Sequence, residues 1–318
     1  MPRLRLFALA LLLAGCPTQP GDDDDSAGGG DVFGPDREAS LDGSCAADAL
    51  YGAFVVEEQA QFGVAGGTLS DGVVPITILE EVEAIGDCAL LRRNVPFCDP
   101  ACSPGFTCDH DGQCVAFPEP QDLGVVGLRG VGEPLEMRPV QPGNRYFGTG
   151  LSNPPFTPGK TVLLDALNAP EGELLLEGVG VPRLEVPPGD VVVQEGQPIA
   201  LSWTAPDVAT PARVHLELTI DQHGTSPVRV SCDFPDTGSA EVPAALVNGL
   251  FSAGVSGYPN ATAARRTVDS APFLDGCAEL RVASSAELSV RVAGHTPCDG
   301  PDDCPDDMSC DVATNTCI

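Results

Sequence analysis

Positively charged residues are scarce in this 318-residue sequence. Lys and Arg together number 16 against 46 Asp and Glu, so the formal net charge is -30, and Lys160 is the sole lysine. A strongly acidic surface repels nucleic acid phosphates and anionic lipid headgroups. The composition therefore argues against nucleic acid as a partner and against membrane binding through a basic patch.

Aromatic residues are also few, at 5% of the chain, although the hydrophobic fraction of 42% is ordinary. Hydrophobic cores must then be built mainly from Val, Leu, Ala and Ile. The 36 Gly and 31 Pro predict many short strands and turns instead of long helices. So few aromatic rings also argue against a stacking platform for sugars.

No catalytic motif stands out. HExxH, GxSxG, a P-loop and GxGxxG are absent, and so is the CxxC of zinc ribbons and thioredoxin-like sites. The histidines are scattered at His110, His215, His223 and His295. A carboxylate pair for glycoside hydrolysis could lie among the 46 acidic residues, but nothing marks one. We predict a non-enzymatic binding, adhesion or structural role. The alternative is an extracytoplasmic hydrolase that acts on glycan or peptide.

The amino terminus has the pattern of an export signal. Two arginines precede an apolar run at 6–13, which is about half of the roughly 20 residues needed to span a bilayer. The run ends in Leu13-Ala14-Gly15-Cys16, which resembles the lipobox of a bacterial lipoprotein. The resemblance implies that 1–15 is a signal peptide and that Cys16 becomes the lipidated first residue.

Residues 16–44 are expected to form a disordered acidic and glycine-rich tether. They contain a run of four aspartates at 22–25 and three glycines at 28–30, with little to bury. The predicted location is the cell envelope, at the outer membrane or cell surface, with the periplasmic face left open. The expected partners are the membrane, through the Cys16 lipid, and an unidentified protein or glycan ligand.

The remaining chain predicts an all-β fold with two sandwich-like domains. Short apolar runs separated by glycine-rich turns predict a β domain at 45–186, interrupted by a cysteine-rich insertion at 95–117. Apolar and polar residues alternate within 187–294, as expected for half-buried antiparallel strands. About seven such strands resemble an immunoglobulin-like or fibronectin-like sandwich. However, Trp203 precedes Cys232 and so departs from the antibody-domain pattern.

Of the 13 cysteines, twelve follow Cys16, an even number in a chain expected to be exported. Such a count predicts six disulfides in an oxidising compartment. These cysteines are Cys45, Cys88, Cys98, Cys102, Cys108, Cys114, Cys232, Cys277, Cys298, Cys304, Cys310 and Cys317.

The insertion and a carboxy-terminal module at 295–318 share one plan of four cysteines each. Neither is long enough to bury an apolar core, so disulfides must hold it. Both resemble the short cysteine-rich repeats of secreted proteins, such as the dickkopf amino-terminal region or a truncated EGF-like module. Together with the lipobox, they suggest a myxobacteria-like surface lipoprotein.

Four cysteines allow three connectivities in each module. We predict pairing of first with third and second with fourth, which gives Cys98–Cys108, Cys102–Cys114, Cys298–Cys310 and Cys304–Cys317. The remaining bridges are expected to be Cys45–Cys88 and Cys232–Cys277, one within each β domain. Each should stabilise the fold by about 2–4 kcal/mol.

Two acidic stretches are weak calcium candidates. Asp109 and Asp111 open an oxygen-rich loop, and Asp302, Asp303 and Asp306 belong to an acidic cluster in the carboxy-terminal module. Ca²⁺ needs several oxygens that converge on one point, and neither stretch completes an EF-hand loop. We expect solvated turns, with calcium as the alternative, and no other cofactor.

Overall fold

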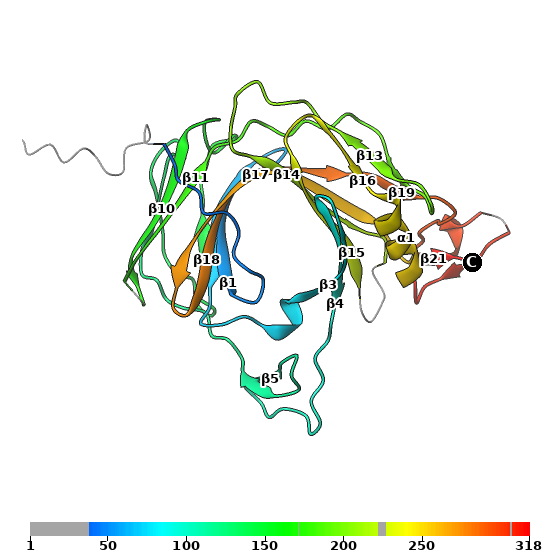
Figure 1. The fold of residues 1–318 in the computed structure, drawn as a ribbon, viewed down its shortest axis with the longest axis horizontal. Coiled ribbons are helices and arrows are strands. Elements are labelled where there is room, and N and C mark those ends of the chain that lie inside the picture. Colours follow the sequence, from blue (N-terminus) through cyan, green and yellow to red (C-terminus); the bar gives the residue numbers. More distant parts are fainter. Residues whose placement is uncertain (1–37, 171, 222–226, 306) are drawn as a thin grey trace, which may run out of the picture. The chain divides into compact units, whose positions relative to one another are not determined.

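The computed structural model describes residues 38–170, 172–221, 227–305 and 307–318 (Figure 1). The predicted signal peptide, Cys16 and most of the tether lie outside the described residues, as do His223 and Asp306. The described chain consists mainly of strands, with one α-helix, α1 (Ala244–Ala253), so the fold is all-β. None of its helices is long and apolar enough to cross a membrane.

The largest element of the described fold is a sheet of nine strands (Figure 1). In spatial order its strands are β3 (Leu79–Ile85), β4 (Cys88–Arg93), β15 (Val228–Pro235), β14 (Arg213–Thr219), β17 (Asn260–Phe273), β18 (Gly276–Leu288), β1 (Leu50–Glu58), β2 (Gly63–Leu69) and β9 (Tyr146–Gly148). Neighbouring strands are antiparallel except β1 and β18, which run parallel with Phe54 beside Leu280. The parallel pair therefore lies inside the sheet and not at its edge.

A four-stranded sheet packs on the part of the large sheet that contains β1 and β18. Its order is β11 (Gly172–Val179), β10 (Thr161–Ala169), β7 (Val126–Arg129) and β8 (Leu135–Met137). Alternate residues of both layers point inward and form a core that includes Phe54, Leu164, Leu176 and Leu280. The rings of Phe54 and Tyr146 lie 5.6 Å apart in this core.

A second core lies under β14, β15 and β17. Two short pairs and α1 cover it: β12 (Val191–Val193) runs parallel to β19 (Val290–Val292), and β13 (Ile199–Ser202) runs antiparallel to β16 (Ser239–Val242). The alternation expected at Val214, Leu216 and Leu218 is present, because these side chains are buried while the intervening residues are partly exposed. Residues 187–294 thus contribute a sandwich-like layer arrangement.

The predicted boundary at 187 does not separate two sheets. β4, from the first predicted domain, pairs with β15 of the second, and β18 of the second pairs with β1 of the first. Two cores share one sheet instead of forming two self-contained domains. Alternation in the sequence shows which face of a strand is buried, but it does not show which strand lies beside it.

The cysteine-rich segments form small hairpins. The insertion pairs β5 (Phe106–Cys108) with β6 (Cys114–Ala116), and the carboxy-terminal module pairs β20 (Cys310–Asp311) with β21 (Thr316–Cys317). Two 3₁₀ turns, η1 (Pro75–Thr77) and η2 (Pro301–Asp303), complete the described elements. With few buried apolar residues, the hairpins depend on their disulfides.

Candidate functional site

A pocket of about 750 Å³ lies where the β1–β2 loop, residues 59–62, meets β17 and the end of β18. Its remaining wall is the segment at 183–184, which follows β11. The size is within the usual range of pockets for small ligands, about 300–1,000 Å³. The wall formed by β17 and β18 is fixed by strand pairing, because Thr262 lies opposite Glu287 and Ala264 lies opposite Ser285.

An ion pair fixes one wall of this pocket. Glu58 is 2% exposed, and Arg183 Nε donates to its Oε1 at 2.6 Å, with Nη2 also in contact. The neighbouring amide of Leu184 donates to Ser284 Oγ at 3.0 Å. A buried carboxylate with a charged donor is held in one orientation. This wall is therefore fixed before any ligand arrives.

Glu57, the residue before Glu58 on β1, also lines this pocket. Ser285 Oγ donates to Glu57 Oε1, and Gln59 Nε2 donates to Oε2 at 3.1 Å. The pocket thus contains a carboxylate, amide groups and a hydroxyl whose positions are linked by hydrogen bonds. Such groups recognise hydroxyls on a ligand by donating and accepting hydrogen bonds.

Phe62 adds an aromatic face to the polar groups. Its side chain is 53% exposed, and the loop that carries it is closed by the Gln59 amide, which donates to Phe62 O at 3.0 Å. Asn153 Nδ2 also donates to Gln59 O at 3.2 Å and supports the loop from outside. The low aromatic content led us to expect no stacking platform, yet this loop presents one ring beside polar groups.

Two other pockets are present in the described part of the chain. One of about 850 Å³ lies between residues 183–192 and β13. Another, of about 540 Å³, opens on the face of the large sheet beside His215 and Arg266. There a hydrogen bond with His215 lowers the pKa of Glu217, and burial lowers the pKa of Arg266. Arg266 Nη2 lies 3.0 Å from His215 Nδ1 and 3.6 Å from Asp233 Oδ1, so one end of the Arg266 guanidinium is already paired.

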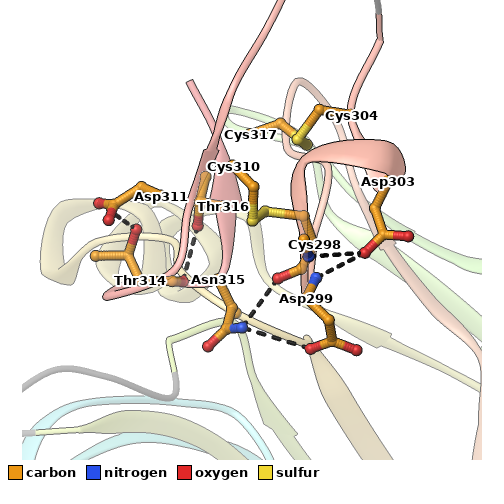
Figure 2. The surroundings of a disulfide bond; sticks show 12 residues. Cys298, Asp299, Asp303, Cys304, Cys310, Asp311, Thr314, Asn315, Thr316 and Cys317 are labelled. Atoms are coloured by element: carbon orange, nitrogen blue, oxygen red, sulfur yellow. Dashed lines mark hydrogen bonds between the residues drawn. A yellow bond between two sulfur atoms is a disulfide. The ribbon is translucent and has the colours of Figure 1, made fainter.

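All twelve cysteines in the described part of the chain form disulfides. In both modules the first cysteine pairs with the third and the second with the fourth, as we predicted. Figure 2 shows the carboxy-terminal module, in which Cys298–Cys310 lies beside Cys304–Cys317.

The other two predicted bridges are wrong. Cys45 pairs with Cys277, and Cys88 pairs with Cys232. Cys88 and Cys232 are directly opposite each other on β4 and β15, and Cys45 precedes the strand that lies beside β18. Both bridges therefore join the two predicted domains, because strands of each domain are neighbours in the shared sheet.

The calcium candidates are not brought together. Asp109 Oδ1 accepts from the amides of Asp111 and Gln113, at 3.0 and 2.7 Å, and so caps its own turn. In the carboxy-terminal module, Asp303 Oδ2 accepts from the amides of Asp299 and Gly300 (Figure 2). These carboxylates therefore accept hydrogen bonds within their own turns.

Asp302 lies in η2 and is exposed, and Asp306 is outside the described residues. Among the described residues, the groups of three or more potential ligand atoms within 4.8 Å of one another are two cysteine triplets. Their sulfurs are in disulfides, whereas a metal binds the thiolate. Neither triplet is therefore available to a metal while oxidised.

Sequence reasoning missed the β1–β2 pocket. Its polar groups come from three distant segments, and only the fold brings Glu58 to Arg183 and Glu57 to Ser285. One signal was present: Phe62 ends a short polar loop between two apolar runs, where burial of an aromatic ring is not expected.

No protein-family model and no curated protein matches this chain. Among solved structures, a Ca²⁺-stabilised adhesin that helps an Antarctic bacterium reach out and bind ice is 12% identical. The match covers 80% of this chain and 52% of that one, with a TM-score of 0.20. This chain thus spans about half the length of the adhesin chain, and at this TM-score the likeness defines neither a fold nor a function.

Proposed function

We propose that this chain is an exported, lipid-anchored protein of the bacterial cell envelope that binds a ligand without catalysis. The supporting observation is the pairing of all twelve cysteines in the described part into six disulfides. Disulfides at this density belong to oxidising compartments. The lipobox-like segment that ends at Cys16 accounts for both export and anchoring.

The proposed binding site is the β1–β2 pocket, and the proposed ligand is a short neutral glycan. The exposed ring of Phe62 offers an apolar surface for one face of a sugar ring. Glu57 and Gln59 offer acceptors and donors for its hydroxyls. The net charge of -30 opposes polyanionic ligands.

The test is a binding screen of neutral oligosaccharides with the purified protein. Phe62→Ala should weaken binding of a recognised oligosaccharide at least tenfold, because the stacking surface is lost. The matched control is Phe147→Ala on β9, since Phe147 is similarly exposed at 58% and is not among the residues of this pocket. Equal affinity of wild type and Phe62→Ala would refute the site.

The same screen separates binding from hydrolysis. A binding protein leaves the recognised oligosaccharide intact after long incubation. Release of new sugar ends that depends on Glu57 or Glu58 would instead support the alternative hydrolase.

The anchor has its own test. Cys16→Ala should leave an uncleaved precursor or a protein without lipid, and normal lipid-labelled, membrane-bound protein would refute the lipobox. Protease treatment of intact cells, followed by detection of the carboxy-terminal module, then decides which face of the envelope the protein occupies. Release of the module indicates the cell surface, and protection indicates the periplasm.

A further inference from the structure

The segment that leads into β1 is held by hydrogen bonds from its main-chain amides to carboxylates on β11, β17 and β18. Residues 38–44 belong to the predicted disordered tether, but the Ser40 amide donates to Glu177 Oε2 and the Asp42 amide donates to Asp269 Oδ1, both at 2.9 Å. The Cys45 amide donates to Glu279 Oε1 at 2.7 Å. The residues from Ser40 to Cys45 are therefore attached to the folded part of the chain.

A covalent bond follows at once. Cys45 is joined to Cys277 at the start of β18, and the parallel strand β1 begins beside the same residue, with Leu50 in register with Cys277. β18 has five strands on one side and three on the other. The chain thus becomes covalently attached to the interior of the sheet before its first strand starts.

We propose that the Cys45–Cys277 disulfide carries the pulling force of the membrane tether directly into β18. This inference rests on the proposed amino-terminal anchor. The residues between the two cysteines form a closed covalent loop, so tension at the amino terminus cannot unravel them in sequence from β1. The β1–β2 loop, which carries the proposed ligand site, lies within this protected loop.

The second long bridge is nested within the first. Cys88–Cys232 closes a loop with a sequence separation of 144, inside the separation of 232 closed by Cys45–Cys277. The difference between the two separations is 88 residues. While the outer bridge is intact, the inner bridge carries no tension from the ends. If the outer bridge is cut, tension passes to the inner one.

The nesting predicts an order of events under force. The full oxidised chain is held by handles at its two ends under constant force, and a small thiol reductant is added. Cleavage of Cys45–Cys277 should release the 88 residues outside the inner loop, a step of about 300 Å at 3.3–3.6 Å per residue. Cleavage of Cys88–Cys232 should follow as a second step, of up to about 500 Å.

Two variants sharpen the test without reductant. Under force, Cys88→Ser/Cys232→Ser should reach the same end-to-end length as wild type, because that bridge lies inside the loop closed by Cys45–Cys277. Cys45→Ser/Cys277→Ser should extend about 300 Å further. If a variant does not fold, the reductant experiment on wild type still decides.

The result that overturns the proposal is a large step at Cys88–Cys232 before any step of about 300 Å, or full extension of oxidised wild type. Failure of the anchor is distinguishable, because Cys16→Ala would then leave membrane attachment unchanged while the two-step pattern persisted. Failure of the force path would change the step order and leave the lipid attachment intact.

Discussion

Arg265 is 1% exposed and is the largest fully buried side chain in the described part of the chain. Its Nε and Nη2 donate to the two carboxylate oxygens of Asp236 at 2.6 and 3.0 Å. Its remaining hydrogen bonds go to the carbonyls of Pro182, Arg183 and Thr204. The guanidinium thus binds five acceptors and joins β17 to three loops.

We predict that Arg265→Met destabilises the fold by about 3–5 kcal/mol, because the change leaves the buried carboxylate of Asp236 without its charged partner. For a unit of this size the loss corresponds to a fall in Tm of roughly 10 °C. Asp236 Oδ1 also accepts from Trp203 Nε1 at 2.7 Å, and Trp203 is the sole tryptophan. Its fluorescence during denaturant unfolding therefore reports the change at this network.

The control removes both charges. Arg265→Met/Asp236→Leu should be more stable than Arg265→Met alone, since no unpaired charge stays buried. Arg265→Met should also weaken oligosaccharide binding, because Arg265 Nη1 holds the main chain of Arg183 at the proposed ligand site. A loss below about 1 kcal/mol for Arg265→Met would refute the reasoning, since that is the size expected of an exposed ion pair.

Three further predictions concern the bridges, a titrating carboxyl and calcium. Cys45→Ser/Cys277→Ser should lower the free energy of unfolding, measured with denaturant, by about 4.5 kcal/mol, because a loop of 88 residues is no longer closed. Loss of Cys98–Cys108, with a separation of 10, should lower it by about 2.7 kcal/mol. Equal losses would contradict the dependence on loop length. The pKa of Glu217 is lowered in the folded state, so its stabilisation is present above its ordinary pKa and is lost as pH falls through the lowered value. Glu217→Gln should reduce the loss of unfolding free energy as the pH is lowered, and an unchanged pH dependence would contradict this. Because the aspartates of both modules cap turns, Tm should be equal in EDTA and in Ca²⁺, and a fall in EDTA would revive the calcium alternative.

The sequence predicted those features that depend on residues close together in the chain. Pairing inside each module left three connectivities, of which the predicted one is present, and alternation identified the buried face of β14. The partners of Cys45 and Cys88 were not predictable in the same way. They depend on strands more than a hundred residues away in sequence, and the predicted domain boundary excluded those partners.

The site shows the same limit. Composition shows that aromatic rings are few, but a count cannot show that Phe62 is half exposed and lines the same pocket as Glu57. Likewise, no local pattern relates Arg183 to Glu58, because β1 and the segment after β11 meet only once the four-stranded sheet has packed.

The parallel pair of β1 and β18 also determines when folding can finish. β1 is synthesised early, but its neighbour in the sheet follows more than 200 residues later, as the Cys45–Cys277 separation of 232 indicates. Contacts so distant in sequence form slowly. The centre of the sheet therefore closes only after most of the chain has been synthesised. The proposed export would therefore act on a chain whose central sheet is still open, and the Cys45–Cys277 bridge would form after that sheet has closed.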